Sequence, residues 1–465
     1  MRAYRYVALP VLALGLAAYA ACTSDSFGVV VPNFDAASID APTSDTGPLA
    51  DSGPDVVEGD AAGCPGDPAV TRLCSEQCTD ISTSKANCGG CGSACVDGVK
   101  GASTCAASAC TCATGNYCPT TGCVDFATSL TDCGACGNAC ETGATCTSGV
   151  CLKSVAQAGV NCALAVAVTS TTIAWSDFCS GPAVKGCPLT GCVGTPTTLI
   201  AYLGGRTRYG IASATSGGTG YIFTTDNNYS QGLSRVDTAG AGYAEWGSAQ
   251  DNAGPIASDG TTIVFADQGA TYRAVAGTSG VTKVMNIGGA HSGFLNGPPI
   301  ATVAIDAASL FVATPTSIYR CAVGGTCTGT PAADPTLLSA ALSKVLAISS
   351  DGTKVYASGG TDFNYVPGVT ETIYSVPVAG GTPTAEVQLS PAADGGGTHL
   401  GLIATSKALY WGSLDGGLYR CDKANCSATK TAIVPSAKVY GLAQDANYIY
   451  WINHVTGAAM RTPKI

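Results

Sequence analysis

The chain has 465 residues, of which 60 are glycine and only 12% are charged, and its net charge is −10. The scarcity of strong helix formers and the abundance of Gly and Thr favour short strands and turns over a helical protein. No basic run occurs, which argues against a nucleic-acid partner. Most of the acidic excess lies between residues 35 and 60, where it indicates a solvated tether rather than a binding face.

The first 21 residues predict an export signal. Arg2 and Arg5 precede an apolar stretch, residues 7–18, that is followed by small residues, and this order is typical of a secretory signal peptide. The stretch is too short to span a bilayer as a stable helix, and no later segment reaches 18 apolar residues. We therefore expect an extracytoplasmic protein whose cysteines pair as disulfides.

The segment Ala20-Ala21-Cys22 resembles a bacterial lipobox, which implies that Cys22 becomes a lipidated N-terminus. Tyr19 departs from the Leu, Val or Ile that this pattern usually has, and the alternative is ordinary cleavage after Ala20, which leaves Cys22 as a plain thiol. Parity favours the lipid, because the other 24 of the 25 cysteines can pair completely. Acyl chains would hold the protein on a membrane. Thr23 stands where inner-membrane retention needs Asp, so we expect an outer-membrane or cell-surface lipoprotein, or a secreted protein if Cys22 carries no lipid.

Residues 22–63 are expected to form a disordered acidic linker behind the lipid. Pro, Gly, Ser, Asp and Ala dominate the segment and no apolar period is visible. Such a composition cannot bury enough surface to offset the entropy lost on ordering.

Residues 64–151 form a tandem duplication that is rich in cysteine. Residues 78–95 align without gaps onto residues 123–140, with Asp80 matching Asp125 and with the same CGxCG core. Each copy then ends in a C-x4-C pair. These spacings resemble the stigma-specific cysteine-rich family, which also occurs as tandem modules in bacterial surface lipoproteins. The sixteen cysteines of the duplication are Cys64, Cys74, Cys78, Cys88, Cys91, Cys95, Cys105, Cys110, Cys112, Cys118, Cys123, Cys133, Cys136, Cys140, Cys146 and Cys151.

Disulfides are expected to hold these modules, because the segment has too few large apolar residues for an ordinary core. The sequence does not predict which cysteine pairs with which. The C-x2-C pairs 88/91 and 133/136 also match half of a zinc site. The modules contain no His and follow an export signal, so we expect neither a metal nor a cofactor.

Residues 152–465 repeat a unit of short strands. The second strand of each unit carries apolar and aromatic residues, and seven such strands start roughly 40 to 54 residues apart, the length of a four-stranded propeller blade. They are residues 171–177, 220–226, 261–267, 308–314, 353–359, 407–413 and 447–453. The pattern predicts an all-β, seven-bladed β-propeller.

The last unit lacks a fourth strand, and residues 152–158 belong to no unit. We expect residues 152–158 to complete the last blade, because an open ring would leave unpaired sheet edges. The LYW and IYW strands, followed by RC-x4-5-C hairpins, resemble the YWTD/NHL class of propellers. That class commonly has six blades, so a six-bladed ring is the alternative.

The remaining cysteines are spaced for local disulfides within blades. We expect Cys187–Cys192, Cys321–Cys327 and Cys421–Cys426 to staple hairpins, and Cys162–Cys179 to pair within the first blade. All of these cysteines are expected to be structural.

No catalytic motif is present, and the chain contains only three histidines, His291, His399 and His454. They fall in three different blades, and we expect exposed loop histidines rather than a site. Trp175, Trp411 and Trp451 occupy the same place in their blades, where packing between blades explains them better than ligand stacking does.

The sequence thus favours a lipid-anchored binding protein that recognises a protein, glycan or envelope component. One alternative is a propeller lyase or hydrolase with a site at the axial mouth, and another is a structural envelope component. Neither the ligand nor the oligomeric state is predicted.

Overall fold

A computed structural model describes residues 64–67, 69–157, 163–177, 183–192, 195–201, 208–226, 232–246, 254–266, 270–286, 302–325, 327, 336–340, 342, 345–359, 371–389, 399–413, 417–435 and 437–464. These residues divide into two compact units, which meet in sequence between Lys153 and Ser154. The predicted signal peptide, Cys22 and the acidic linker lie outside the described residues. No helix among the described residues has the length and apolarity needed to cross a bilayer.

The first unit contains the duplicated modules and consists of short antiparallel hairpins. Their strands are β1 (Thr71–Cys74), β2 (Gln77–Asp80), β3 (Ser103–Ala106), β4 (Ala109–Cys112), β5 (Asn116–Cys118), β6 (Gly122–Val124), β7 (Thr145–Thr147) and the start of β8 (Val150–Gln157). The buried apolar residues of the unit are chiefly cysteines, joined by Ile81, Val124 and a few others. Cross-links therefore take the place of an ordinary core, as the composition predicts.

The duplication extends to individual hydrogen bonds. The amide of Cys95 donates to the Lys85 carbonyl at 2.8 Å, and the amide of Cys140 donates to the Leu130 carbonyl at the same distance. The matched Asp80 and Asp125 accept hydrogen bonds from the turn that follows each of them. For Asp80 the bonds from Ser82 lower the carboxyl pKa most strongly.

The CGxCG glycines are needed because the backbone is left-handed at these positions. Gly89 has φ +74° and Gly134 has φ +77°. A Cβ atom would lie 2.6 Å from the Ser108 carbonyl oxygen at Gly89 and 2.4 Å from the Gly149 carbonyl oxygen at Gly134. Both the backbone conformation and the close approach therefore exclude a side chain.

The second unit is a seven-bladed β-propeller of antiparallel sheets. The sheets in chain order are β9 (Ala163–Val168), β10 (Thr172–Asp177), β11 (Ala183–Pro188) and β12 (Thr197–Ile200); β13 (Arg208–Ser216), β14 (Thr219–Asp226), β15 (Leu233–Asp237) and β16 (Ala244–Trp246); β17 (Ile256–Ser258), β18 (Thr262–Ala266), β19 (Ala270–Val275) and β20 (Thr282–Asn286); β21 (Thr302–Ile305), β22 (Ser309–Ala313), β23 (Ile318–Ala322) and β24 (Thr336–Ser339); β25 (Val345–Ser350), β26 (Lys354–Gly359), β27 (Glu371–Pro377) and β28 (Thr384–Leu389); β29 (His399–Ala404), β30 (Ala408–Ser413), β31 (Gly417–Asp422) and β32 (Thr431–Val434); and β33 (Val439–Gln444), β34 (Tyr448–Asn453) and β35 (Ala458–Pro463) with β8.

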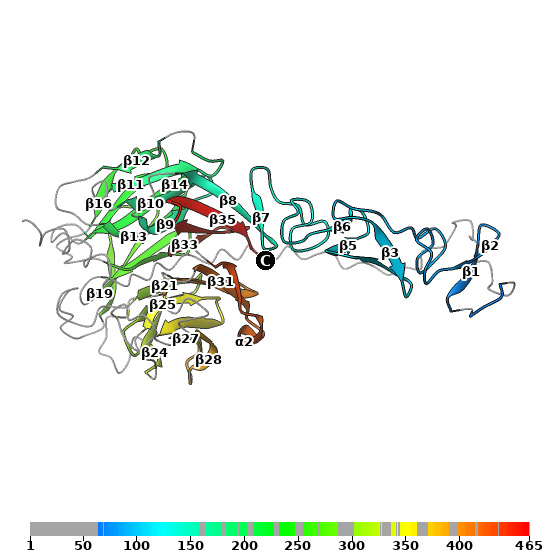
Figure 1. Ribbon diagram of the computed structural model, residues 1–465. Helices are drawn as coiled ribbons and strands as arrows, with labels where there is room; N and C mark the ends of the chain where they lie inside the picture. The colour runs from blue at the N-terminus through cyan, green and yellow to red at the C-terminus, as the bar shows by residue number, and fades with distance from the viewer. Residues whose placement is uncertain are drawn as a thin grey trace, which may run out of the picture. The chain divides into compact units, whose positions relative to one another are not determined.

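The first strands of the blades form a closed ring. β9 contacts β13, each later first strand contacts the next, and β33 returns to β9. The six-bladed alternative is therefore wrong. In the last sheet β8, the segment from upstream of the repeats, lies beside β35 (Figure 1).

The blade cores are made by the second strands, whose residues are nearly all buried. Trp175, Trp411 and Trp451 are 0% exposed and stand at equivalent positions of β10, β30 and β34. A short helix, α2 (Cys426–Thr429), joins β31 to β32 and was not predicted from the sequence. Its cap is the side chain of Asn425, which accepts from the Ala428 amide at 3.4 Å.

Candidate functional site

The propeller has two different ends, because alternate turns of an antiparallel sheet lie at opposite ends of its strands. We call the end with the first-to-second and third-to-fourth strand turns the stapled end. The other end, with the second-to-third strand turns and the connections between blades, is the loop end. The described residues include most of the stapled end and only two complete second-to-third turns at the loop end, residues 314–317 and 454–457.

Short polar side chains cap the first turn of six blades at the stapled end. The Oδ1 atoms of four aspartates each accept two backbone amide hydrogen bonds at 2.7–2.9 Å, and two threonine hydroxyls do the same at 2.9–3.4 Å. The residues are Asp259, Asp306, Asp351, Asp445, Thr169 and Thr405. Asx and ST turns of this kind fix tight hairpins, so these carboxylates serve the scaffold.

Disulfides close three of the third-to-fourth strand connections at this end. Cys187 is bonded to Cys192, Cys321 to Cys327 and Cys421 to Cys426, with Cα–Cα distances of 5.3, 6.1 and 4.8 Å. Cys162 and Cys179 lie outside the described residues.

A group of charged residues links the fifth and sixth blades at the stapled end. Lys423 forms an ion pair with Asp351, whose side chain is 5% exposed, and the Tyr356 hydroxyl donates to the same carboxylate at 3.2 Å. Burial alone would raise the pKa of Asp351, but hydrogen bonds from Lys423 and from the turn backbone outweigh it and hold the pKa below its usual value. Burial raises the pKa of Tyr356, and the neighbouring carboxylates add to that shift. The Asp351 carboxyl is thus ionised at neutral pH and the Tyr356 phenol is neutral.

Arginines of the third strands join neighbouring blades, and this role was not predicted. Arg320 donates from Nη1 to the Val378 carbonyl in the next blade at 3.0 Å, and Arg461 donates to the Leu189 carbonyl, from the seventh blade to the first, at 3.3 Å. Arg273 makes the same bond to Val323. In each case the acceptor is the residue that follows the third strand of the next blade.

In the second blade the arginine stacks instead. The Arg235 guanidinium lies 4.7 Å from the Tyr221 ring centroid and 4.5 Å from that of Trp246. The arginine of the third strands recurs in the sequence, but the carbonyl groups that Arg273, Arg320 and Arg461 bond lie 50 to 272 residues away, so the sequence does not predict them.

At the loop end the structure describes one histidine side chain, that of His454. Its Nε2 lies 2.6 Å from the Ala163 carbonyl oxygen at the start of the first blade. Burial lowers the pKa of His454, and Lys438 adds to this shift, whereas the bond to Ala163 opposes it. The side chain is half-buried, so the expectation of an exposed loop histidine is wrong here. Val455, the next residue, is 62% exposed.

The other two histidines are not brought into a described site. His291 lies outside the described residues. His399 begins β29, and its side chain is likewise outside them.

The modules share one disulfide connectivity. In each copy the eight cysteines, in chain order, pair first with third, second with fifth, fourth with seventh and sixth with eighth. The bonds are Cys64–Cys78, Cys74–Cys91, Cys88–Cys105 and Cys95–Cys110 in the first copy, and Cys112–Cys123, Cys118–Cys136, Cys133–Cys146 and Cys140–Cys151 in the second. All sixteen sulfurs are therefore oxidised, and the two C-x2-C pairs join other partners instead of acting together as a metal half-site.

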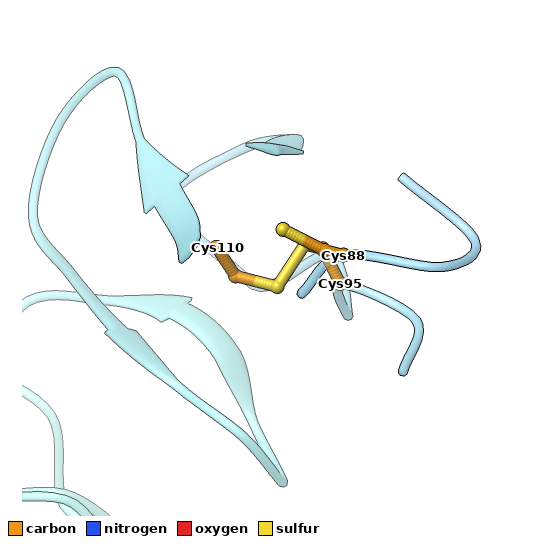
Figure 2. Close-up of side chains that lie close together, drawn as sticks. All are labelled: Cys88, Cys95 and Cys110. Atoms are coloured by element: carbon orange, nitrogen blue, oxygen red, sulfur yellow. A yellow bond between two sulfur atoms is a disulfide. The ribbon is translucent and has the colours of Figure 1, made fainter. Parts of the chain in front are cut away.

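Sulfur atoms of two disulfides meet inside each copy. Figure 2 shows the side chains of Cys88, Cys95 and Cys110 close together. Their Sγ atoms all lie within 4.8 Å of one another, and so do those of Cys133, Cys140 and Cys151. Cys88 is 7% exposed and Cys95 is 5% exposed. This closeness of two cystines was not predicted, because it depends on the connectivity.

Comparisons with known proteins give no family. No family model matches the chain and no curated protein matches it. Among solved structures, virginiamycin B lyase from Staphylococcus aureus is 12% identical, with a TM-score of 0.49, and the match covers 68% of this chain and 99% of that one. A chain of a mitotic checkpoint complex is 11% identical, with a TM-score of 0.47 and coverages of 68% and 93%. Likenesses at this level carry no argument about function, and the architecture rests on the chain's own sheets.

Proposed function

We propose that this chain is an exported binding protein that recognises a glycan or protein of the cell envelope through the loop end of its propeller. A lipid on Cys22 would hold it at a membrane. A propeller suits recognition because a rigid ring presents many variable connections on one end.

The distribution of aromatic residues carries the proposal. Connections that leave the strands at the loop end contain six aromatic residues, whereas those at the stapled end contain Tyr243 alone. Aromatic side chains supply large contact area at low entropic cost and are enriched where proteins bind partners. The six are Phe178, Tyr202, Tyr229, Phe294, Phe363 and Tyr365, whose own placement is outside the described residues.

The polar groups of the stapled end already have partners within the protein, which also favours the loop end as the binding surface. The described carboxylates of Asp259 and Asp351 cap turns, Asp351 also pairs with Lys423, and the described cysteines of this end are in disulfides. That end is built for rigidity, which leaves the loop end as the surface for a ligand.

A photo-crosslinking amino acid tests the proposal in the full chain on intact cells. Placed at Tyr365 it should yield adducts with an envelope component, whereas the same group at Tyr243, which is 42% exposed at the stapled end, should not. Adducts of equal yield at both positions would refute recognition by the loop end. If the purified chain cleaves a polymer that it captures, the protein is a lyase or hydrolase rather than a binding protein.

The lipid is supported by cysteine parity. The eleven disulfides of the described residues leave only Cys22, Cys162 and Cys179. Cys162 and Cys179 can pair with each other, so Cys22 is the odd residue. The intact mass of the mature protein should show acyl chains on an N-terminal Cys22. A free thiol there, or a chain that starts at Ala21, would refute the anchor.

A further inference from the structure

Two disulfides of each module form a compact sulfur cluster. In the first module these are Cys88–Cys105 and Cys95–Cys110, and the cluster consists of their four sulfurs. Because the Sγ of Cys88 lies within 4.8 Å of the Sγ atoms of Cys95 and Cys110, a thiolate on Cys88 would be close to contact with the neighbouring disulfide.

The same four cysteines are placed for a second pairing. Cys105 and Cys110 face each other directly across the β3–β4 hairpin. Opposite residues of an antiparallel pair have Cα atoms about 4.5–5.5 Å apart, which lies within the range that a disulfide spans. Cys105 could therefore bond to Cys110, and the Sγ atoms of Cys88 and Cys95, which lie within 4.8 Å of each other, are placed to form the other disulfide.

The second module repeats both features. Its cluster contains the Sγ atoms of Cys133, Cys140 and Cys151 within 4.8 Å, and Cys146 faces Cys151 across the β7–β8 hairpin. No other group of three cysteines approaches so closely among the residues that the structure describes. The arrangement is thus a specific property of the duplicated unit.

We propose that each sulfur cluster is a thiol–disulfide exchange site whose reaction partner is a low-molecular-weight thiol. Cys105, a half-buried residue, receives the incoming thiolate on its sulfur, and the buried Cys88 passes the exchange to the adjacent disulfide. Burial of Cys88 and Cys95 keeps the internal step within the cluster.

Each step forms one S–S bond and breaks another. The external thiolate bonds to Cys105 and releases the Cys88 thiolate, which bonds to Cys95 and releases the Cys110 thiolate. The Cys110 thiolate then bonds to Cys105 and releases the external thiolate. The net change is an isomerisation without oxidation or reduction, so the thiol acts catalytically.

The exchange changes what the bonds connect. The observed disulfides tie the β3–β4 hairpin to the loop that contains Cys88 and Cys95. The second pairing closes the hairpin and the loop each on itself. A small thiol would thereby loosen the module without reducing it.

A single substitution in the full chain tests the internal step. Cys105→Ser leaves one thiol on Cys88, and at about pH 8 exchange should move on the order of half of it to Cys95 and Cys110. Alkylation after an acid quench, followed by peptide mapping, locates the thiol. The matched control is Cys91→Ser, which frees Cys74 from a disulfide outside the cluster, and there the label should stay on Cys74. A label confined to Cys88 would overturn the proposal.

The unaltered protein provides the second measurement if the variant misfolds. With about a tenth of an equivalent of a monothiol, peptides cross-linked Cys88–Cys95 and Cys105–Cys110 should appear while Cys74–Cys91 stays intact. If Cys88–Cys105 and Cys95–Cys110 remain the only pairing of these four cysteines, or if Cys74–Cys91 scrambles equally, the proposal fails.

Discussion

Replacing Arg320 by Leu should destabilise the propeller by about 3 kcal/mol, because two hydrogen bonds of its guanidinium are lost. Nε donates to the Ser309 hydroxyl at 2.8 Å and Nη1 donates to the Val378 carbonyl in the next blade at 3.0 Å. Hydrogen bonds to a charged group contribute about 1.5–3 kcal/mol each. Ser309 is 2% exposed, so water cannot easily replace the lost donor, whereas the leucine recovers part of the buried aliphatic contact.

Urea denaturation followed by tryptophan fluorescence measures this loss selectively. All four tryptophans of the chain, residues 175, 246, 411 and 451, lie in the propeller, so the cross-linked modules do not contribute to the signal. Arg320→Lys should be intermediate, because lysine keeps the charge but cannot bond both acceptors. Lys407→Ala, at an exposed turn, is the matched control and should change stability by less than about 0.5 kcal/mol. A loss below about 1 kcal/mol for Arg320→Leu would refute a structural role for the inter-blade arginines.

Three further outcomes follow from the contacts described above. Asp351→Asn should lower stability most above about pH 3.9, the unfolded carboxyl pKa, because the lowered pKa of Asp351 stabilises the fold there and this contribution shrinks as pH falls through the folded pKa; a loss in urea titrations that does not shrink between pH 7 and pH 3 would contradict this. Burial raises the pKa of Tyr356 and of Tyr450, so their neutral phenols stabilise the folded protein fully below about pH 10, and this contribution is lost as pH rises through the raised pKa. Changing both to Phe should leave the absorbance titration of the folded protein unchanged below about pH 10. Gly134→Ala should prevent native disulfide pairing of the second module, because its Cβ would meet the Gly149 carbonyl oxygen at 2.4 Å; normal recovery of a native disulfide map would show that the loop can adapt.

The sequence predicted the all-β architecture and the seven blades, because each second strand carries a strong apolar and aromatic pattern. The predicted strand at residues 407–413 is β30, Ala408–Ser413, and the one at 447–453 is β34, Tyr448–Asn453. The structure adds that the carboxylates of Asp259 and Asp351 accept hydrogen bonds from the amides of the first turns of their blades.

Contacts between segments distant in sequence could not be predicted. Arg320 and Val378 belong to different blades, and their pairing depends on how neighbouring sheets pack. The disulfide connectivity of the modules was open for the same reason, since a spacing such as Cys88-x2-Cys91 does not tell which loop folds back on which. The half-burial of His454 also arises only where the seventh blade meets the first.

The arrangement of the last sheet has a consequence for the order in which the protein is made. β8 is translated before every other strand of the ring, yet its neighbour β35 is the last of these strands in sequence. The cystines of the modules, in contrast, span only 11 to 18 residues, so their loops close at small entropic cost. The modules can therefore be cross-linked while the ring is still incomplete, and β8 offers a template on which β35 can dock.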